Sequence, residues 1–343
     1  MGSRRTLPAV RSLDELHLVR EDLKRDGFAG VAAVESPQEL ERLRARFFDW
    51  IEGLGTGADR RDPTTWTDVG AGRLGVIHGH GISHSQFVWD VRQNENVYRV
   101  FSYLWGTGNL LVSFDGACFS EHVQPPEHFP HKWLIFPSWA HVDQPPTEKG
   151  LVTIQGLLTL YDSEEEDGGL VVWRRSHKRV TGIEWAHRLV FRTVGGEIRK
   201  PAAPALMMGN TTHFYDDSLS FLRGCRRVKT CGRAGTLFLW DSRTVHCNTA
   251  PLASRKRAEP IPRAVAYVCM TPKAHATREQ VERKRRAFED MEGHGHDPRG
   301  LSYFPRSRSR ENTPRPDVGQ LGLRLAGVEA YEDEADLSKA GRL

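Results

Sequence analysis

Long hydrophobic segments are missing from this sequence, because its 343 residues contain no uninterrupted apolar run of eighteen or more. A helix that crosses a bilayer needs about 20 predominantly apolar residues, so we expect no transmembrane segment. The N-terminus also lacks the apolar stretch of a secretory signal, which predicts an intracellular, cytoplasmic protein. Gly2 and Thr6 fit the loose pattern for N-myristoylation, which many unmodified chains share.

Cysteines are few and show no pairing pattern. The five cysteines are an odd number and include no C-x-x-C pair, which argues against both a disulfide framework and a thiolate zinc site. Hydrophobic residues make up 38% and charged residues 27% of the chain, as in ordinary soluble proteins. The net charge of +4 is spread along the chain rather than gathered in one block, so the sequence gives no strong signal for nucleic-acid binding.

Three segments show the spacing of apolar residues that is typical of helices. Within 12–52 the apolar residues recur at steps of three and four, which predicts two helices on the outside of the main domain. Residues 94–105 predict a further helix, and the charged segment 277–291 predicts a solvent-facing one. The stretch 53–85 is rich in Gly, Asp and Thr, so we expect it to be mostly loop.

Short runs of β-branched and aromatic residues fill much of the middle of the chain. Short strands without interleaved helices favour a closed or sandwiched antiparallel β structure over an α/β sheet. The expected strands are 110–119, 133–136, 151–161, 170–173, 235–240 and 263–270. We therefore divide the chain into N-terminal helices packing on the core (1–60), a β domain (61–275) with an insertion at 182–230, and a C-terminal helix with a partly irregular tail (276–343).

Two potential metal ligands stand in the segment AHVDQPP. His141 and Asp143 are two residues apart, and because side chains alternate along a strand, both project from the same face. An imidazole and a carboxylate side by side supply two of the three ligands in the facial triad that binds iron(II). The H-x-D pattern is common by chance, so it needs a third ligand elsewhere in the chain.

His246 is the candidate for that third ligand. It follows the predicted strand GTLFLW by a few residues and lies about a hundred residues beyond the first pair. This separation is too long for a local chelate, but a rolled β structure can place an early and a late strand side by side. Two histidines and one carboxylate leave coordination positions open for a bidentate 2-oxo acid and for dioxygen.

Arg263 begins the predicted strand RAVAYVCM, seventeen residues after His246. A 2-oxo diacid bound to a metal through its keto-acid end still has a distal carboxylate, and a guanidinium group binds it with two charge-assisted hydrogen bonds. An arginine at the start of an otherwise apolar strand suits this role. Arg255 and Arg257 in the preceding polar segment are alternatives.

Four motifs occur in a fixed order: HVD, DGGLVVWRRSHK, GTLFLWDSRTVH and PRAVAYVCM. In this order they resemble the phytanoyl-CoA dioxygenase family, over roughly residues 85–290. The resemblance implies a mainly β fold with flanking helices around a double-stranded β-helix, a jelly-roll of the cupin kind. It also implies Fe(II), 2-oxoglutarate and O2, with His141, Asp143 and His246 as iron ligands and Arg263 as the 2-oxoglutarate clamp.

The implied reaction releases succinate and carbon dioxide and hydroxylates an unactivated C–H bond, with desaturation or ring formation left open. The substrate is expected to be a small or lipid-like molecule. Gln155, Thr159 and Asn248 are expected to support the metal or bind the co-substrate, while an ordinary core or turn role is at least as common for such residues. Trp133 and Trp240 are candidates for the cavity wall.

Two alternatives to this function stay open: a non-catalytic binding or regulatory protein with the same fold, and a cupin-type metalloenzyme that does not use 2-oxoglutarate.

Three further sequence patterns are weaker indications of function. Gly70–Gly75 match G-x-G-x-x-G without the strand that a dinucleotide site requires. His78, His80 and His84 lie close together beside two glycines, which favours a mobile segment at the substrate entrance over a zinc site. His294 and His296 are expected in a polar loop after the C-terminal helix.

Overall fold

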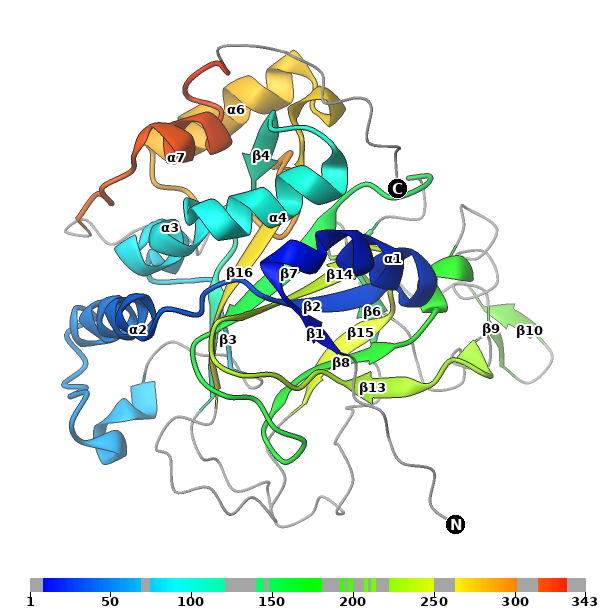
Figure 1. The fold of residues 1–343 in the computed structure, drawn as a ribbon, viewed down its shortest axis with the longest axis horizontal. Coiled ribbons are helices and arrows are strands. Elements are labelled where there is room, and N and C mark those ends of the chain that lie inside the picture. The colour runs from blue at the N-terminus through cyan, green and yellow to red at the C-terminus, as the bar shows by residue number, and fades with distance from the viewer. Residues whose placement is uncertain are drawn as a thin grey trace.

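A computed structural model gives the fold of the protein (Figure 1). It describes residues 9–68, 75–120, 140–144, 148–180, 192–194, 197–199, 207–208, 211–213, 222–249, 263–300 and 314–331. In this described part, no helix combines the length and the hydrophobicity that crossing a bilayer requires. The predictions on Gly2, Trp133, Arg255, Arg257 and residues 133–136 lie outside the described residues.

The larger of two main sheets has eight strands in the order β1-β2-β14-β7-β16-β5-β3, with β4 also paired to β16. Its centre consists of β14, β7 and β16, which pair antiparallel with one another. The strands are β1 (Val10–Arg11), β2 (Phe28–Ala32), β3 (Val76–Ile77), β4 (Leu110–Val112), β5 (Ala117–Ser120), β7 (Ile154–Thr159), β14 (Thr236–Asp241) and β16 (Arg263–Pro272).

The smaller sheet has six strands in the order β11-β12-β6-β15-β8-β13, and all of its pairings are antiparallel. Its strands are β6 (His141–Val142), β8 (Gly169–Trp173), β11 (Met207–Met208), β12 (Thr211–His213), β13 (Arg227–Lys229) and β15 (His246–Thr249). A separate hairpin pairs β9 (Arg192–Val194) with β10 (Glu197–Arg199).

The two sheets face one another across an apolar interior. Leu157, Phe238 and Val265 of the larger sheet form one buried cluster with Leu170 and Val172 of the smaller sheet. Because side chains alternate along each strand, this contact also fixes which neighbouring positions point inward. The described part of the chain is therefore mostly strands in two facing sheets, with helices outside them.

Helices cover the outer face of the larger sheet (Figure 1). Their apolar stripes pack on the strand residues that point away from the interior, such as Leu158 and Leu239. The helices are α1 (Leu16–Asp26), α2 (Pro37–Glu52), α3 (Gln86–Arg92), α4 (Glu95–Trp105), α6 (Arg278–Glu289) and α7 (Gln320–Leu325).

A glycine sets the sharp turn from α1 into β2. Gly27 ends α1 in the left-handed conformation with φ of 87°, and its backbone N–H donates to the Leu23 carbonyl. A β-carbon at this position would lie 2.4 Å from Nδ1 of His177 and 2.6 Å from Oγ1 of Thr244, so only glycine fits. The turn places β2 at once beside β14, in the same sheet that α1 covers.

The predicted helices and most predicted strands in the described part are present. The run 110–119 is two strands, β4 and β5, and Asn94 caps α4 rather than belonging to it. The sequence pattern did not indicate β2 or α3, nor the strands β12 and β13 inside the segment 182–230, and β13 pairs with β8 of the smaller sheet. The three-part division of the chain stays a prediction.

Candidate metal centre

His141 and His246 lie directly opposite one another in the smaller sheet. β6 and β15 pair antiparallel with His141 in register with His246, although the two residues are about a hundred positions apart in the sequence. Their imidazole rings have centroids 4.3 Å apart. The pairing of β6 with β15 thus brings together the two histidines that lie far apart in the sequence.

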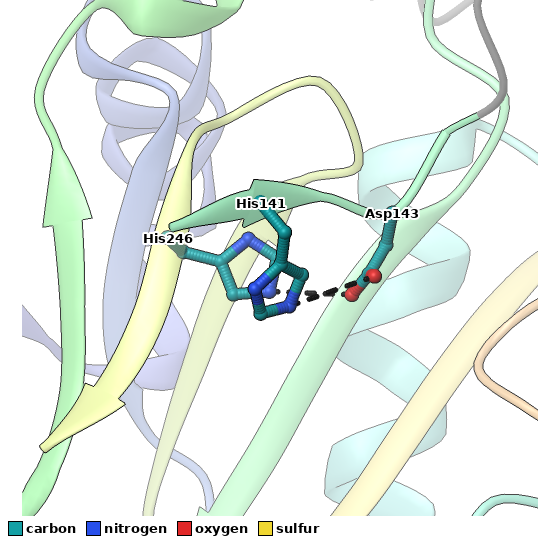
Figure 2. A group of neighbouring side chains, drawn as sticks. All are labelled: His141, Asp143 and His246. Carbon is teal, nitrogen blue, oxygen red and sulfur yellow. Dashed lines mark ion pairs between the residues drawn. The ribbon is translucent and has the colours of Figure 1, made fainter. Parts of the chain in front are cut away.

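Asp143 completes a group of three potential ligands (Figure 2). It follows β6, and its backbone N–H donates to the Ser242 carbonyl, which ties the end of β6 to the turn between β14 and β15. Nε2 of His141 is 3.7 Å from Oδ1 of Asp143, and Nε2 of His246 is 3.2 Å from Oδ2. One ligand atom from each residue lies within 4.8 Å of the others, and this is the one such group among the described residues.

Two hydrogen bonds hold these ligands in orientations that suit a metal. Nδ1 of His246 lies 2.9 Å from the Thr244 carbonyl, to which it donates, so that in the neutral ring the lone pair is on Nε2, the nitrogen that faces Asp143. Nε2 of Gln155 donates to Oδ2 of Asp143 at 2.8 Å. Gln155 therefore contacts a candidate ligand directly. It is the first residue of β7 whose side chain points toward the interior.

The carboxyl group of Asp143 is held in its ionised form. Burial alone would raise its pKa, but the neighbouring His296, His141 and His246 outweigh burial and hold the pKa well below its usual value. An ionised carboxylate beside two imidazole Nε2 atoms is an attractive site for a divalent cation. The ligand set of two nitrogens and one carboxylate matches the facial arrangement used for non-haem iron.

Arg263 lies on the inner face of β16, in line with Val265 and Tyr267. Its side chain is buried, with the residue only 6% exposed, and its Nη2 has no hydrogen-bond partner within the described part of the structure. An unpaired buried guanidinium nitrogen is costly unless an anion occupies the adjacent space. Arg263 therefore fits the binding of a carboxylate.

The other predicted residues also face the interior. Asn248 shares a face of β15 with His246 and donates through Nδ2 to the Tyr267 hydroxyl at 3.1 Å. Thr159 pairs with Val265 across β7 and β16, and its hydroxyl donates to the Tyr161 carbonyl at 2.7 Å. These positions line the interior between the metal-ligand group and Arg263, and whether they bind a co-substrate stays a prediction.

Trp240 and Tyr267 add to the interior surface. The Trp240 ring lies 5.2 Å from the His246 ring between centroids, and its buried Nε1 has no partner among the described residues. Tyr267 was missed at the sequence level, although it stands four positions after Arg263 and strand alternation places both on one face. Burial raises the pKa of Tyr267 far above its usual value, so the hydroxyl stays protonated.

His294 and His296 lie in an irregular segment after α6, as predicted, but His294 is buried in the core rather than placed in a solvated loop. His294 is 1% exposed and lies 3.1 Å from Nζ of Lys284, while Nδ1 of His296 lies 3.8 Å from Oδ1 of Asp143. The segment after α6 folds back against the β core, where the backbone N–H of His294 donates a hydrogen bond to the Phe114 carbonyl. No local sequence pattern predicts the approach of His296 to Asp143, because the two residues are more than 150 positions apart in the sequence.

The histidines at 78, 80 and 84 do not form one site. His84 is fully buried, and its two ring nitrogens contact the Glu292 carbonyl at 3.1 Å and Nε1 of Trp89 at 3.4 Å. His78 instead lies with Nδ1 3.4 Å from Oδ1 of Asp115. Among the described residues, only His141, Asp143 and His246 form a group that could hold a metal ion, so His78, His80 and His84 make no such group.

Comparisons with known proteins confirm the resemblance that the motifs indicated. The chain is 28% identical over 185 residues to a putative phytanoyl-CoA dioxygenase of Dictyostelium discoideum, covering 44% of this chain and 53% of that protein. It is 29% identical over 281 residues to the Ava biosynthesis cluster protein O of Aspergillus versicolor, covering 79% of this chain and 82% of that protein. No family model matches the chain.

A solved structure shares the fold across nearly the whole chain. GlcNAc Inducible Gene 2 (DUF1479) of Candida albicans aligns with a TM-score of 0.59 and 14% identity, covering 97% of this chain and 83% of that one. At this level of identity the likeness concerns the fold alone. The chain thus resembles a putative phytanoyl-CoA dioxygenase and has a His-Asp-His group in its interior.

Proposed function

We propose that the protein is an Fe(II)- and 2-oxoglutarate-dependent dioxygenase that hydroxylates an unactivated C–H bond of a small organic molecule. The proposal includes a double-stranded β-helix for the two facing sheets, with the metal at the end of the interior where β6 ends and β15 begins. The observation that carries it is the convergence of His141, Asp143 and His246 from two distant segments. Similarity to a putative phytanoyl-CoA dioxygenase supports it.

The side chains of the site fit an iron(II) ion and a 2-oxoglutarate molecule. The two imidazole Nε2 atoms and the ionised Asp143 carboxylate suit iron(II), and a three-residue set leaves coordination positions open. Nη2 of buried Arg263, which has no hydrogen-bond partner among the described residues, suits the distal carboxylate of 2-oxoglutarate. Iron and 2-oxoglutarate, when bound with O2, supply the oxidising chemistry and release succinate and carbon dioxide.

The protein contributes orientation and a dry interior. Gln155 and the Thr244 carbonyl fix two ligands before any metal binds, so that little reorganisation accompanies binding. The apolar residues between the sheets, among them Leu157 and Val172, form a buried cluster that would keep the interior dry. Arg263 would bind the distal carboxylate of the co-substrate and so would direct its 2-oxo acid group toward the three metal ligands.

The test is turnover of 2-oxoglutarate by purified protein. Supplied with iron(II), ascorbate and oxygen, the protein is expected to convert 2-oxoglutarate to succinate, slowly without substrate and faster when a substrate is added. A cupin-type enzyme without 2-oxoglutarate chemistry would bind iron and form no succinate. A non-catalytic binding protein would form none under any condition.

A further inference from the structure

His296 stands beside the metal-ligand group without a role in it. Its Nδ1 faces Asp143, with 3.8 Å between Nδ1 and Oδ1, but its ring is not part of the group whose ligand atoms lie within 4.8 Å of one another. On the opposite side of the ring, Nε2 is buried and has no hydrogen-bond partner among the residues that the structure describes. A buried nitrogen of this kind calls for a partner from outside the chain.

The segment that carries His296 is fastened on both sides. Before it, the backbone N–H of His294 donates to the Phe114 carbonyl at 3.0 Å. After it, Asp297 pairs with Arg299 at 2.7 Å, and Arg299 also reaches Glu148 at 3.1 Å, close to the loop that follows Asp143. A ring positioned by two such anchors is preorganised for binding, because little conformational freedom is left to lose.

A second polar pair, Asp115 and His78, lies near enough to His296 for Asp115 and His296 to interact electrostatically. Asp115 has a side chain that is only 8% exposed, and its Oδ1 lies 3.4 Å from Nδ1 of His78 and accepts a hydrogen bond from the Gly116 backbone N–H at 2.7 Å. The His78 side chain is 42% exposed and so reaches solvent. His296, Asp115 and His78 therefore form a polar wall that runs from beside Asp143 toward the surface.

On the basis of the proposed function, we infer that this polar wall is the substrate-recognition surface, and that the substrate brings a hydroxyl group to Nε2 of His296. An anionic group would face the carboxylate of Asp115, which disfavours it. A plain hydrocarbon chain would leave Nε2 buried and unpaired. A hydroxyl group is neutral and can donate to or accept from an imidazole nitrogen in either tautomer. The substrate class is thus a hydroxyl-bearing small molecule rather than a purely aliphatic one.

The experiment uses two probes of equal shape, phenol and toluene, which differ in a hydroxyl against a methyl group. The whole protein is loaded with Mn(II) and 2-oxoglutarate, which gives no turnover, and relaxation of the probe protons by the bound Mn(II) reports binding near the metal. We expect the ratio of phenol to toluene affinity to fall on the order of 10-fold in His296→Leu, and to be largely kept in His296→Gln. His17→Leu, which changes an exposed histidine on α1, is the matched control and should behave as wild type.

A ratio that changes less than about twofold in His296→Leu, or phenol protons that are not relaxed at all in wild type, would overturn the inference. Thermal unfolding and Mn(II) binding of each variant separate a lost contact from a lost fold, and the preference of wild-type protein for phenol over toluene tests the inference even if the Leu variant is unstable. If wild-type protein binds no Mn(II) together with 2-oxoglutarate, the proposed function itself fails. If it binds both and shows no hydroxyl preference, only the role of His296 fails.

Discussion

Two groups of buried histidines in this protein have opposite characters. Around Asp143, the imidazoles of His141, His246 and His296 approach a carboxylate, and Nε2 of His296 has no partner in the described part of the chain. Under α6, the ring nitrogens of His84 and His294 contact backbone carbonyls, Trp89 and Lys284. We call His84 and His294 the structural histidine pair, and compare them with the metal-ligand group of His141, Asp143 and His246 and with the neighbouring His296.

The comparison shows how histidines that can bind a ligand are distinguished from histidines that only stabilise the fold. Both groups are buried, and both assemble residues that are far apart in the sequence. In the structural pair the hydrogen bonds of each ring are used to fasten one segment to another, so neither ring has capacity for a ligand. In the metal-ligand group, the ring nitrogens point at a common space beside an ionised carboxylate. Unused binding capacity, rather than the number of histidines, marks the site.

The largest expected effect is on succinate formation, which should be lost when a residue of the metal-ligand group is replaced and kept when a residue of the structural histidine pair is replaced. Asp143→Ala and His246→Ala should each lower iron-dependent succinate formation by at least about 100-fold, because the facial ligand set is incomplete without either residue. His84→Gln should keep its turnover per folded molecule, because His84 contacts only structural partners. Retained turnover in either alanine variant would refute the ligand assignment.

The second prediction concerns the co-substrate end of the interior. Arg263→Ala should raise the KM for 2-oxoglutarate by about 10- to 100-fold, since charge-assisted hydrogen bonds contribute roughly 1.5–3 kcal/mol each. The iron requirement should change far less. Arg233→Ala, which removes a side chain that is 92% exposed, is the matched control. If Arg255→Ala or Arg257→Ala raised this KM instead, the clamp would be misplaced.

A third, smaller effect is expected from the residue that orients Asp143. Gln155→Leu removes the hydrogen bond to Oδ2 of Asp143 and should raise the dissociation constant for Mn(II) by about 10-fold, as for other residues that hold a metal ligand in place. Gln38→Leu on the exposed face of α2 serves as its control. Equal affinities of the Gln155 variant and wild type would show that Asp143 needs no such support.

The fourth prediction uses acid to test the structural histidine pair. Burial lowers the pKa of His84 to about 3, and burial likewise holds the pKa of His294 well below its usual value. Unfolded histidine titrates near 6.5, so between about pH 6.5 and 3 the unfolded chain binds protons that the folded chain does not. The free energy of unfolding should therefore fall with decreasing pH in this window, by up to about 1.4 kcal/mol per pH unit for each of the two residues.

Urea unfolding at pH 8, 6 and 5 measures this slope. Wild type should be less stable at pH 5 than at pH 8, and His84→Gln should show a shallower decrease even if its stability at pH 8 is lower. An identical slope in the variant would mean that His84 is charged in the folded protein or accessible to solvent.

The metal-ligand group was predictable because its residues follow local rules. Strand alternation puts His141 and Asp143 on one face, and His246 begins a strand that alternation also fixes. His296 could not be predicted in this way, because its approach to Asp143 depends on a loop that folds back against Phe114, in the connection between β4 and β5. Likewise β2 follows α1 with no pattern of its own, since all but one of its residues are buried and none alternates with exposed positions.

The central claim is that one interior binds a metal and a 2-oxo diacid together, and calorimetric titration under argon tests it most directly. Protein loaded with iron(II) should bind 2-oxoglutarate saturably in a one-to-one ratio, with little binding when iron is omitted and a strongly reduced affinity in Arg263→Ala. Iron binding without any affinity for 2-oxoglutarate, or an affinity that does not depend on the metal, would contradict the account.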